Sequence, residues 1–387
     1  MTTTMTREVL TEDMLSRFGE RAARYDAENT FFHEDFEELR QSGYLKMAVP
    51  EDLGGLGYTL ADVCKQQRRL AYRAPATALA TNMHLYWTGV AADMRRMGDP
   101  SLEWLLREAA AGEVFAAGHG EAGNDLPLFL STASAERVDG GYRFNGHKIF
   151  GSLSPVWTRL GIHAMTADGN IIHAFMPRDT PGYTIKETWD TLGMRATRSD
   201  DTLLQGAIVK DPYIARVLPA GQADLFVLAV FGWAEPTFGS IYLGVAKRAI
   251  DLAIETAHRR KSLALTRTFA YHPEVQSNIA QMAFRFDAAE ALVEKIADEW
   301  SRGVDHGGNW PAKLVSAKHV AVEAAKDIVD RAMAISGGTG MFKGNELERL
   351  YRDVRCGGFH PANTVLAPEI VGKVTLGVDL GEQPRWG

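Results

Sequence analysis

The stretch Arg352-Asp-Val-Arg-Cys-Gly-Gly-Phe-His-Pro-Ala-Asn363 lies near the end of the chain, after a glycine-rich bend at 336–344. Its glycines, proline and asparagine predict a loop. Large rings such as Phe359 and His360 are costly to place on a loop unless something large packs against them. We therefore expect the rest of the chain to hold a flat ligand against this loop.

The composition limits the class of protein. The chain has 387 residues, 45% hydrophobic and 24% charged, which is ordinary for a globular protein of about two to three domains. A net charge of -7 without a basic block argues against nucleic acid as a partner. Two cysteines, Cys64 and Cys356, are too few for a disulfide framework or a thiolate metal site, and they favour a reducing, cytoplasmic location.

Two further features concern targeting. Glu8, Glu12 and Asp13 interrupt any apolar segment near the N-terminus, so we expect no signal peptide. The longest apolar run, residues 225–234, is about half of what a membrane span needs, so no membrane contact is expected.

The periodicity of apolar residues divides the chain into three parts. Residues 1–112 have helical spacing, 113–222 alternate with a period of two, and 223–387 are helical again, with long apolar faces in 279–296 and 314–335 and a helix over 241–257. Strands are predicted at 142–152, 170–177 and 202–210, with a hairpin turn at Asp139-Gly-Gly141. The prediction is an α+β, mostly helical fold with an N-terminal helical domain, a middle antiparallel β-domain and a C-terminal four-helix bundle.

Several common active-site motifs are missing. Gly338-Thr-Gly340 follows a predicted helix, whereas a dinucleotide-binding fingerprint follows a strand. There is no P-loop, no Gly-x-Ser-x-Gly elbow and no His-Glu-x-x-His, and the histidines lack metal-ligand spacing. We therefore expect neither a metalloenzyme nor a nucleoside triphosphatase.

Six segments in order resemble the acyl-CoA dehydrogenase superfamily. They are Pro50-Glu-Asp-Leu-Gly-Gly-Leu-Gly57, Gly118-His-Gly-Glu-Ala-Gly-Asn-Asp125, Asn145-Gly-His-Lys-Ile-Phe-Gly-Ser152, Leu192-Gly-Met-Arg195, Ser336-Gly-Gly-Thr-Gly340 and Leu350-Tyr-Arg-Asp353. The similarity runs from about residue 30 onward. It implies that FAD binds between the β-domain and the bundle, with its adenine end reaching a neighbouring subunit.

The resemblance also implies which residues contact the cofactor. Phe150 and Ser152 would lie beside the isoalloxazine ring, with the serine donating to its N5 edge. The other implied contacts are Gly118, Gly123, Asn124 and Asn363 near the ring, Gly337 and Gly338 at the pyrophosphate, and Arg260, Ser262 and Gln276 across a subunit boundary.

The family's catalytic base is missing from its usual place. In much of the family a glutamate stands nine residues after the arginine of Arg-Asp, where this chain has Pro361 after His360. Some members carry the base on the first helix of the C-terminal domain, which aligns with Ala234, next to Glu235. Glu235 is therefore a candidate base, and the alternative is a solvated or N-terminal helix charge before Pro236.

The substitutions also fit another branch of the same superfamily. Its members are flavin monooxygenases that form a C4a-(hydro)peroxide on FMN or FAD and lack the glutamate. His84, Asn124, Ser152 and His360 would surround the flavin edge, where histidine and asparagine can hydrogen-bond a peroxide and move a proton. For His84 the competing interpretation is a core histidine.

Three functions remain open at this stage. The first is α,β-dehydrogenation of an acyl thioester, bound to CoA or a carrier protein, with Glu235 or His360 as base. The second is a two-component monooxygenase, and the third is a flavoprotein without redox turnover. The expected partners are an electron-transfer flavoprotein or a flavin reductase, and the expected assembly is a homodimer or homotetramer.

Overall fold

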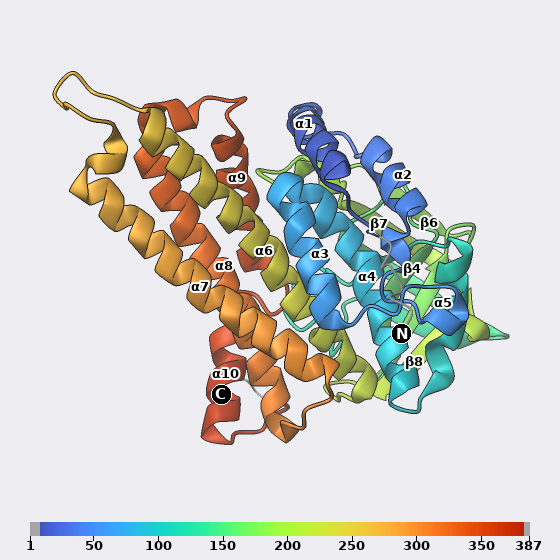
Figure 1. Cartoon of the computed structure of the whole chain (residues 1–387). Helices are drawn as coiled ribbons and strands as arrows, with labels where there is room; N and C mark the ends of the chain where they lie inside the picture. Colours follow the sequence, from blue (N-terminus) through green and yellow to red (C-terminus); the bar gives the residue numbers. More distant parts are fainter. Residues whose placement is uncertain (1–7, 383–387) are drawn as a thin grey trace, which may run out of the picture.

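The computed structural model describes residues 8–382, so residues 1–7 and 383–387 of the first and last predicted domains lie outside the described part. Figure 1 shows long helices on one side of the molecule and a sheet on the other, with the N-terminal helices between them. The α-helices are α1 (Glu12–Glu28), α2 (His33–Ser42), α3 (Leu60–Arg73), α4 (Pro75–Arg96), α5 (Glu103–Ala111), α6 (Leu225–Arg259), α7 (Pro273–Ser301), α8 (Trp310–Ser336), α9 (Glu346–Arg355) and α10 (Leu366–Leu376).

The N-terminal helices begin at clear sequence signals. The hydroxyl of Thr59 and the carboxylate of Asp62 form a reciprocal capping box at the start of α3. Pro75 stands in the first turn of α4, where its missing N–H costs nothing. A Cβ atom at Gly89 of α4 would lie 2.1 Å from the ring of Trp233, so only glycine allows α4 to pack this closely on α6. These helices connect the sheet to the bundle.

The middle segment forms one eight-stranded sheet. Its strands are β1 (Phe115–Gly118), β2 (Ser134–Val138), β3 (Gly141–Gly151), β4 (Arg159–Met165), β5 (Asn170–Pro177), β6 (Tyr183–Lys186), β7 (Asp200–Lys210) and β8 (Ile214–Pro219). Their order is β6-β7-β3-β2-β4-β5-β8, with β1 on β4. The predicted strands and the 139–141 turn are confirmed, but the sheet is mixed, because β4 pairs in parallel with β1 and β2.

The C-terminal helices form the bundle. Helix α6 packs on α7 and α8, the shorter α9 lies against α6 and α8, and α10 covers α8. Helix α6 begins at the cap Asp224, not near residue 241, and continues through Pro236. Within residues 8–382 it is the one helix long and apolar enough to cross a membrane, and 78% of its most apolar window is buried inside the protein, as expected of a core helix.

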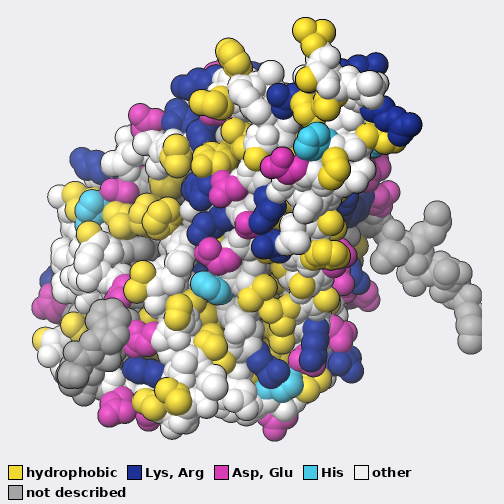
Figure 2. Space-filling view, turned by 90° about the vertical axis from the view of Figure 1, so that its left-hand side faces the viewer, with side chains coloured by type: hydrophobic (Ala, Val, Ile, Leu, Met, Phe, Trp, Pro, Cys, Tyr) yellow, Lys and Arg dark blue, Asp and Glu magenta, His cyan; other side chains and the backbone are white. Residues whose placement is uncertain are grey.

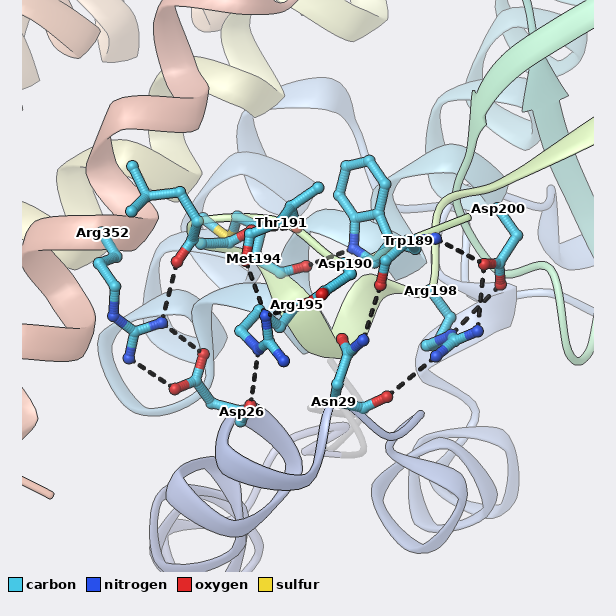
Figure 3. A network of polar contacts seen from close by, with 12 residues as sticks. Asp26, Asn29, Trp189, Asp190, Thr191, Met194, Arg195, Arg198, Asp200 and Arg352 are labelled. Atoms are coloured by element: carbon cyan, nitrogen blue, oxygen red, sulfur yellow. Dashed lines mark hydrogen bonds and ion pairs between the residues drawn. The ribbon is translucent and has the colours of Figure 1, made fainter. Parts of the chain in front are cut away.

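A polar network holds the three parts together (Figure 3). Arg352 of α9 binds both carboxylate oxygens of Asp26 at the end of α1, at 3.0 and 2.6 Å, and donates to the carbonyl of Leu192 at 3.0 Å. Arg195 and Arg198 donate to the carbonyls of Asp26 and Asn29, which lie at the C-terminal end of α1. Guanidinium groups suit this place, because unpaired carbonyls at a helix C-terminus carry partial negative charge. The network places α9, and hence the loop that follows it, against the sheet.

Candidate functional site

The loop 356–363 lies across one face of α6. Glu235, Phe238 and Tyr242 are three and four residues apart, so they project from the same side of this helix. The ring of His360 stacks on that of Phe238, with a centroid distance of 4.5 Å and an interplanar angle of 1°. The hydroxyl of Tyr242 lies 2.7 Å from Nε2 of His360. His360 is thus half-buried and held by two aromatic side chains.

Glu235 is buried among these groups, with only 1% of its surface exposed. Its Oε1 accepts a hydrogen bond from the amide of Ala362 at 3.1 Å, and its Oε2 lies 3.9 Å from Nζ of Lys318 on α8. Burial raises the pKa of Glu235 to about 8, although Lys318 opposes this. The interpretation of Glu235 as a solvated or N-terminal helix charge is therefore wrong, because the residue lies inside a long core helix.

Lys318 is a site residue that the sequence analysis missed. Its Nζ donates to the carbonyl of His360 at 3.0 Å and to that of Ala362. Burial lowers the pKa of Lys318, while Glu235 opposes this. A signal was present, since Lys318 stands on the predicted apolar face between Leu314 and Ala321. A lone charge on such a face needs a buried partner.

His84 has no nitrogen available for a substrate. Its Nε2 bonds the carbonyl of Leu45 at 2.8 Å, and its Nδ1 accepts from the amide of Phe115 at 3.1 Å. Burial lowers its pKa to about 4. The prediction of a catalytic role at the flavin edge fails for this residue, because both ring nitrogens serve the backbone of the core.

The loop after β1 meets the end of β3. The amide of Ile149 donates to the carbonyl of Gly120 at 2.9 Å, which brings Gly118, at the end of β1, near Phe150. Phe150 is 58% exposed, and its backbone has φ of 61°, a strained value for a residue with a side chain. A large ring held outward by strained backbone suits a site that packs a flat ligand.

The side chain of Asn124, which was predicted to contact the flavin, is already hydrogen-bonded within the protein. Both amide hydrogens of Asn124 are used, by Glu121 at 3.0 Å and by the carbonyl of Leu130 at 2.7 Å. The Asn124 amide therefore has no hydrogen left to donate. Gly123, with φ of 77°, makes the turn before it.

Ser152 belongs to a chain of hydroxyl groups. Its Oγ lies 2.7 Å from Ser199, which lies 2.7 Å from Thr197, and Thr197 donates to the carbonyl of Met194 at 2.8 Å. Because that carbonyl can only accept, each hydroxyl donates to the next, and the Ser152 proton is used within the chain. Ser152 then offers lone pairs at this edge, and the predicted donation to N5 is not available.

The loops from the sheet and from the bundle lie together. Leu126 packs against a small apolar cluster that contains Val315, Ala362 and Leu366. The side-chain oxygen of Asn363 accepts from the amides of Val365 and Leu366 at 2.9 Å each, so it stabilises the turn that leads into α10. Its side-chain oxygen is used locally, and its contact with the cofactor stays a prediction that would fall to the side-chain amide nitrogen.

The remaining predicted contacts form a second group at the far end of α6. Nη1 of Arg260 donates to the carbonyl of Ile335 at 2.9 Å, and a Cβ at Gly337 would lie 2.7 Å from that nitrogen. Gly338 is exposed nearby, and the side chains of Ser262 and Gln276 bond only their own turns, at Ala264 and Ala270. Residues 242 and 260 are about 27 Å apart along the helix. The two groups therefore do not line one site within a single chain.

The residues of the first group fit a flavin ring. An exposed aromatic ring, close backbone at Gly118 and Gly120, and a polar edge at Ser152 and His360 suit a flat ligand with a polar rim. Among residues 8–382 no group of three or more histidine, cysteine or acidic side chains is placed to hold a metal ion.

Comparisons with known proteins agree with this architecture. Residues 2–102 match the model of the acyl-CoA dehydrogenase N-terminal domain, and residues 237–364 match that of an acyl-CoA dehydrogenase C-terminal domain. The chain is 30% identical to the putative acyl-CoA dehydrogenase YdbM of Bacillus subtilis, over 89% of this chain and 90% of that one. It is 31% identical to the amino sugar nitrososynthase DnmZ of Streptomyces peucetius, over 88% and 86%.

A solved structure extends the likeness to the fold. KijD3, in complex with FMN and dTDP-3-amino-2,3,6-trideoxy-4-keto-3-methyl-D-glucose, superposes with a TM-score of 0.83 and 26% identity. The superposition covers 100% of this chain and 97% of KijD3. A flavin cofactor is therefore supported, without distinguishing FMN from FAD.

Proposed function

The chain belongs to the acyl-CoA dehydrogenase family of flavin-dependent oxidoreductases, and from this premise we propose that it is a two-component monooxygenase. The observation that carries the proposal is the placement of Glu235. A base for dehydrogenation must reach a hydrogen on substrate carbon, within about 3 Å. Glu235 is 1% exposed, and one of its carboxylate oxygens accepts a hydrogen bond from the amide of Ala362. The loop 356–363 contains no carboxylate.

Several residues of the chain are placed to support oxygen transfer. When bound, the flavin supplies the activation of molecular oxygen. The Phe150 ring would orient the flavin, and Phe238 stacks on the ring of His360 and fixes its plane. His360 is partly exposed and carries a ring nitrogen that can donate, which suits a donor at the reacting edge.

We propose a primary amine as the group that is oxidised. Two observations on other proteins support it: DnmZ is an amino sugar nitrososynthase, and KijD3 was solved with an amino sugar linked to dTDP. The proposed substrate is therefore the amine of a nucleotide-linked sugar. In this proposal the flavin is FMN or FAD, and a separate flavin reductase delivers it in reduced form.

The test uses the purified protein with chemically reduced FMN or FAD. Under ¹⁸O₂, with a panel of nucleotide-linked amino sugars, we expect protein-dependent ¹⁸O in an oxidised amine, measured by mass spectrometry. Free reduced flavin without protein is the control. Absence of ¹⁸O from every amine, together with anaerobic bleaching of the bound flavin by an acyl thioester, would overturn the proposal.

Dehydrogenation of an acyl thioester is the second candidate. It is favoured by the identity to YdbM and by the position of Glu235 on α6, one residue from the place that the family resemblance indicates. Glu235→Gln separates the two functions. It would abolish flavin bleaching by thioesters if Glu235 were the base, and it should leave amine oxidation within about threefold of the parent.

We also propose that the protein assembles as a homodimer or homotetramer in the cytoplasm. Large apolar side chains are exposed on the C-terminal part, namely Leu263, Tyr271, Phe284, Met341, Phe342, Phe359, Val365 and Leu376. Figure 2 shows hydrophobic groups scattered among charged ones on the face seen from the left of Figure 1. A neighbouring copy would also explain why Arg260 lies far from the ring site. Light scattering after gel filtration tests this, and a monomer at micromolar concentration would contradict it.

A further inference from the structure

The hydrogen bond between Tyr242 and His360 determines where the His360 proton lies. Burial raises the pKa of Tyr242 well above its ordinary value, so its hydroxyl stays protonated. Burial, aided by the charge of Lys318, lowers the pKa of His360 to about 3, so the ring is neutral near pH 7. A neutral imidazole carries one hydrogen, on one of its two nitrogens.

Two arrangements satisfy a distance of 2.7 Å between Tyr242 Oη and His360 Nε2. In the first, Tyr242 donates to Nε2, and the ring hydrogen lies on Nδ1. In the second, Nε2–H donates to the phenol oxygen, and the Tyr242 hydrogen needs another acceptor. Within residues 8–382 no other acceptor of the Tyr242 hydroxyl is present, and a buried O–H without an acceptor is costly. The first arrangement is therefore favoured.

The backbone that carries the ring is held from two sides. Lys318 donates to the carbonyls on either side of Pro361, at His360 and Ala362. Glu235 accepts from the Ala362 amide at 3.1 Å, and Phe238 supports the ring at a centroid distance of 4.5 Å. These contacts come from α6 and α8, which are packed core helices, so the ring has a rigid support.

We propose that Tyr242 is a positioning residue that presents His360 as an Nδ1–H donor, and that Lys318 locks the loop in the position this requires. The ligand group that such a donor recognises is an oxygen or nitrogen lone pair. Only the kinetic consequence rests on the proposed function, because the tautomer and the rigidity of the loop are properties of the protein without flavin.

The tautomer is measured by long-range ¹H–¹⁵N correlation on flavin-free protein with ¹⁵N-labelled histidine. The His360 signals are assigned by their loss in His360→Gln. In the parent we expect hydrogen on Nδ1 and an acceptor at Nε2, and in Tyr242→Phe a mixture of tautomers or the Nε2–H form. Hydrogen on Nε2 in the parent, or an unchanged pattern in Tyr242→Phe, would overturn the assignment.

The restraint that Lys318 places on the loop is tested by the rate at which diethyl pyrocarbonate carbethoxylates His360, and peptide mass spectrometry locates the modified residue. Lys318→Met should raise the rate at His360 by at least about fivefold, because two hydrogen bonds to the loop are lost. The control is Asp93→Asn on α4, since Asp93 accepts from the indoles of Trp233 and Trp300 at 2.7 Å each and has no hydrogen bond to the loop 356–363. An equal rate in Lys318→Met and the parent refutes the role of Lys318, and an equal rise in the control refutes it as well, because the loop would then respond to any loosening of the protein.

The two proposals can fail separately. If the amine-oxidation test fails but His360 carries its hydrogen on Nδ1, the proposed function is wrong and the positioning stands. If both hold, Tyr242→Phe should lower the rate of product formation by roughly five- to tenfold without changing flavin affinity. If Lys318→Met does not fold, the spectrum of Tyr242→Phe still decides the role of the tyrosine.

Discussion

Gly193→Ala tests whether the close backbone contact between the loop before β7 and α9 stabilises the folded protein. A Cβ at residue 193 would lie 2.4 Å from the carbonyl oxygen of Arg352 and 2.7 Å from the amide nitrogen of Asp353. Both are backbone atoms, so no side chain can swing away. The loop or α9 must move by about 1 Å to restore an ordinary contact.

That movement would disturb two hydrogen bonds at the same place. The amide of Met194 donates to the buried carboxylate of Asp353 at 2.6 Å, and Arg352 donates to the carbonyl of Leu192 at 3.0 Å. Each involves a charged group and contributes about 1.5–3 kcal/mol. We therefore expect Gly193→Ala to lower the free energy of unfolding by about 3–5 kcal/mol, a large share of the stability of a typical domain.

The assay is urea unfolding at pH 7, followed by tryptophan fluorescence and far-UV circular dichroism. The matched control is Gly308→Ala, since a Cβ there meets no atom within 4 Å. The control should stay within about 0.5 kcal/mol of the parent. A loss below about 1 kcal/mol for Gly193→Ala would refute the close contact.

Three further predictions follow from buried or strained groups. Burial raises the pKa of Glu235 to about 8 from its ordinary 4.5. Between these two pH values the folded protein keeps a proton on Glu235 that the unfolded chain releases. Its contribution to stability should therefore fall as pH rises from about 5 to 8, by up to about 1.4 kcal/mol per unit, and urea midpoints of Glu235→Gln should show a flatter profile. Asp93→Ala should cost at least about 2 kcal/mol, because the buried indole N–H groups of Trp233 and Trp300 lose their acceptor; an unchanged melting temperature would contradict this. Phe150→Gly should relieve the positive φ and keep stability within about 1 kcal/mol, yet weaken flavin binding at least about tenfold by fluorescence titration; unchanged affinity would remove Phe150 from the site.

The sequence identified the elements that depend on local pattern. The strands predicted at 142–152, 170–177 and 202–210 and the turn at 139–141 follow from alternation and glycine, and the structure has these strands at 141–151, 170–177 and 200–210. The start of α6 was misplaced: a helix was predicted over 241–257, whereas the helix runs over Leu225–Arg259 and continues through Pro236 because neighbouring helices pack against it. The parallel pairings of β4 were also missed, since pairing of distant strands leaves no mark in local alternation.

For the site, the sequence alone determined the family, the flavin and the absence of the usual glutamate, because these depend on motifs in linear order. Only the tertiary structure decided that Glu235 and Lys318 are buried against the loop, that His84 serves the core, and that Tyr242 holds His360. The physical reason is that one residue along a helix turns a side chain by about 100°. Whether that side chain meets water, backbone or a ligand then depends on what distant elements pack against it.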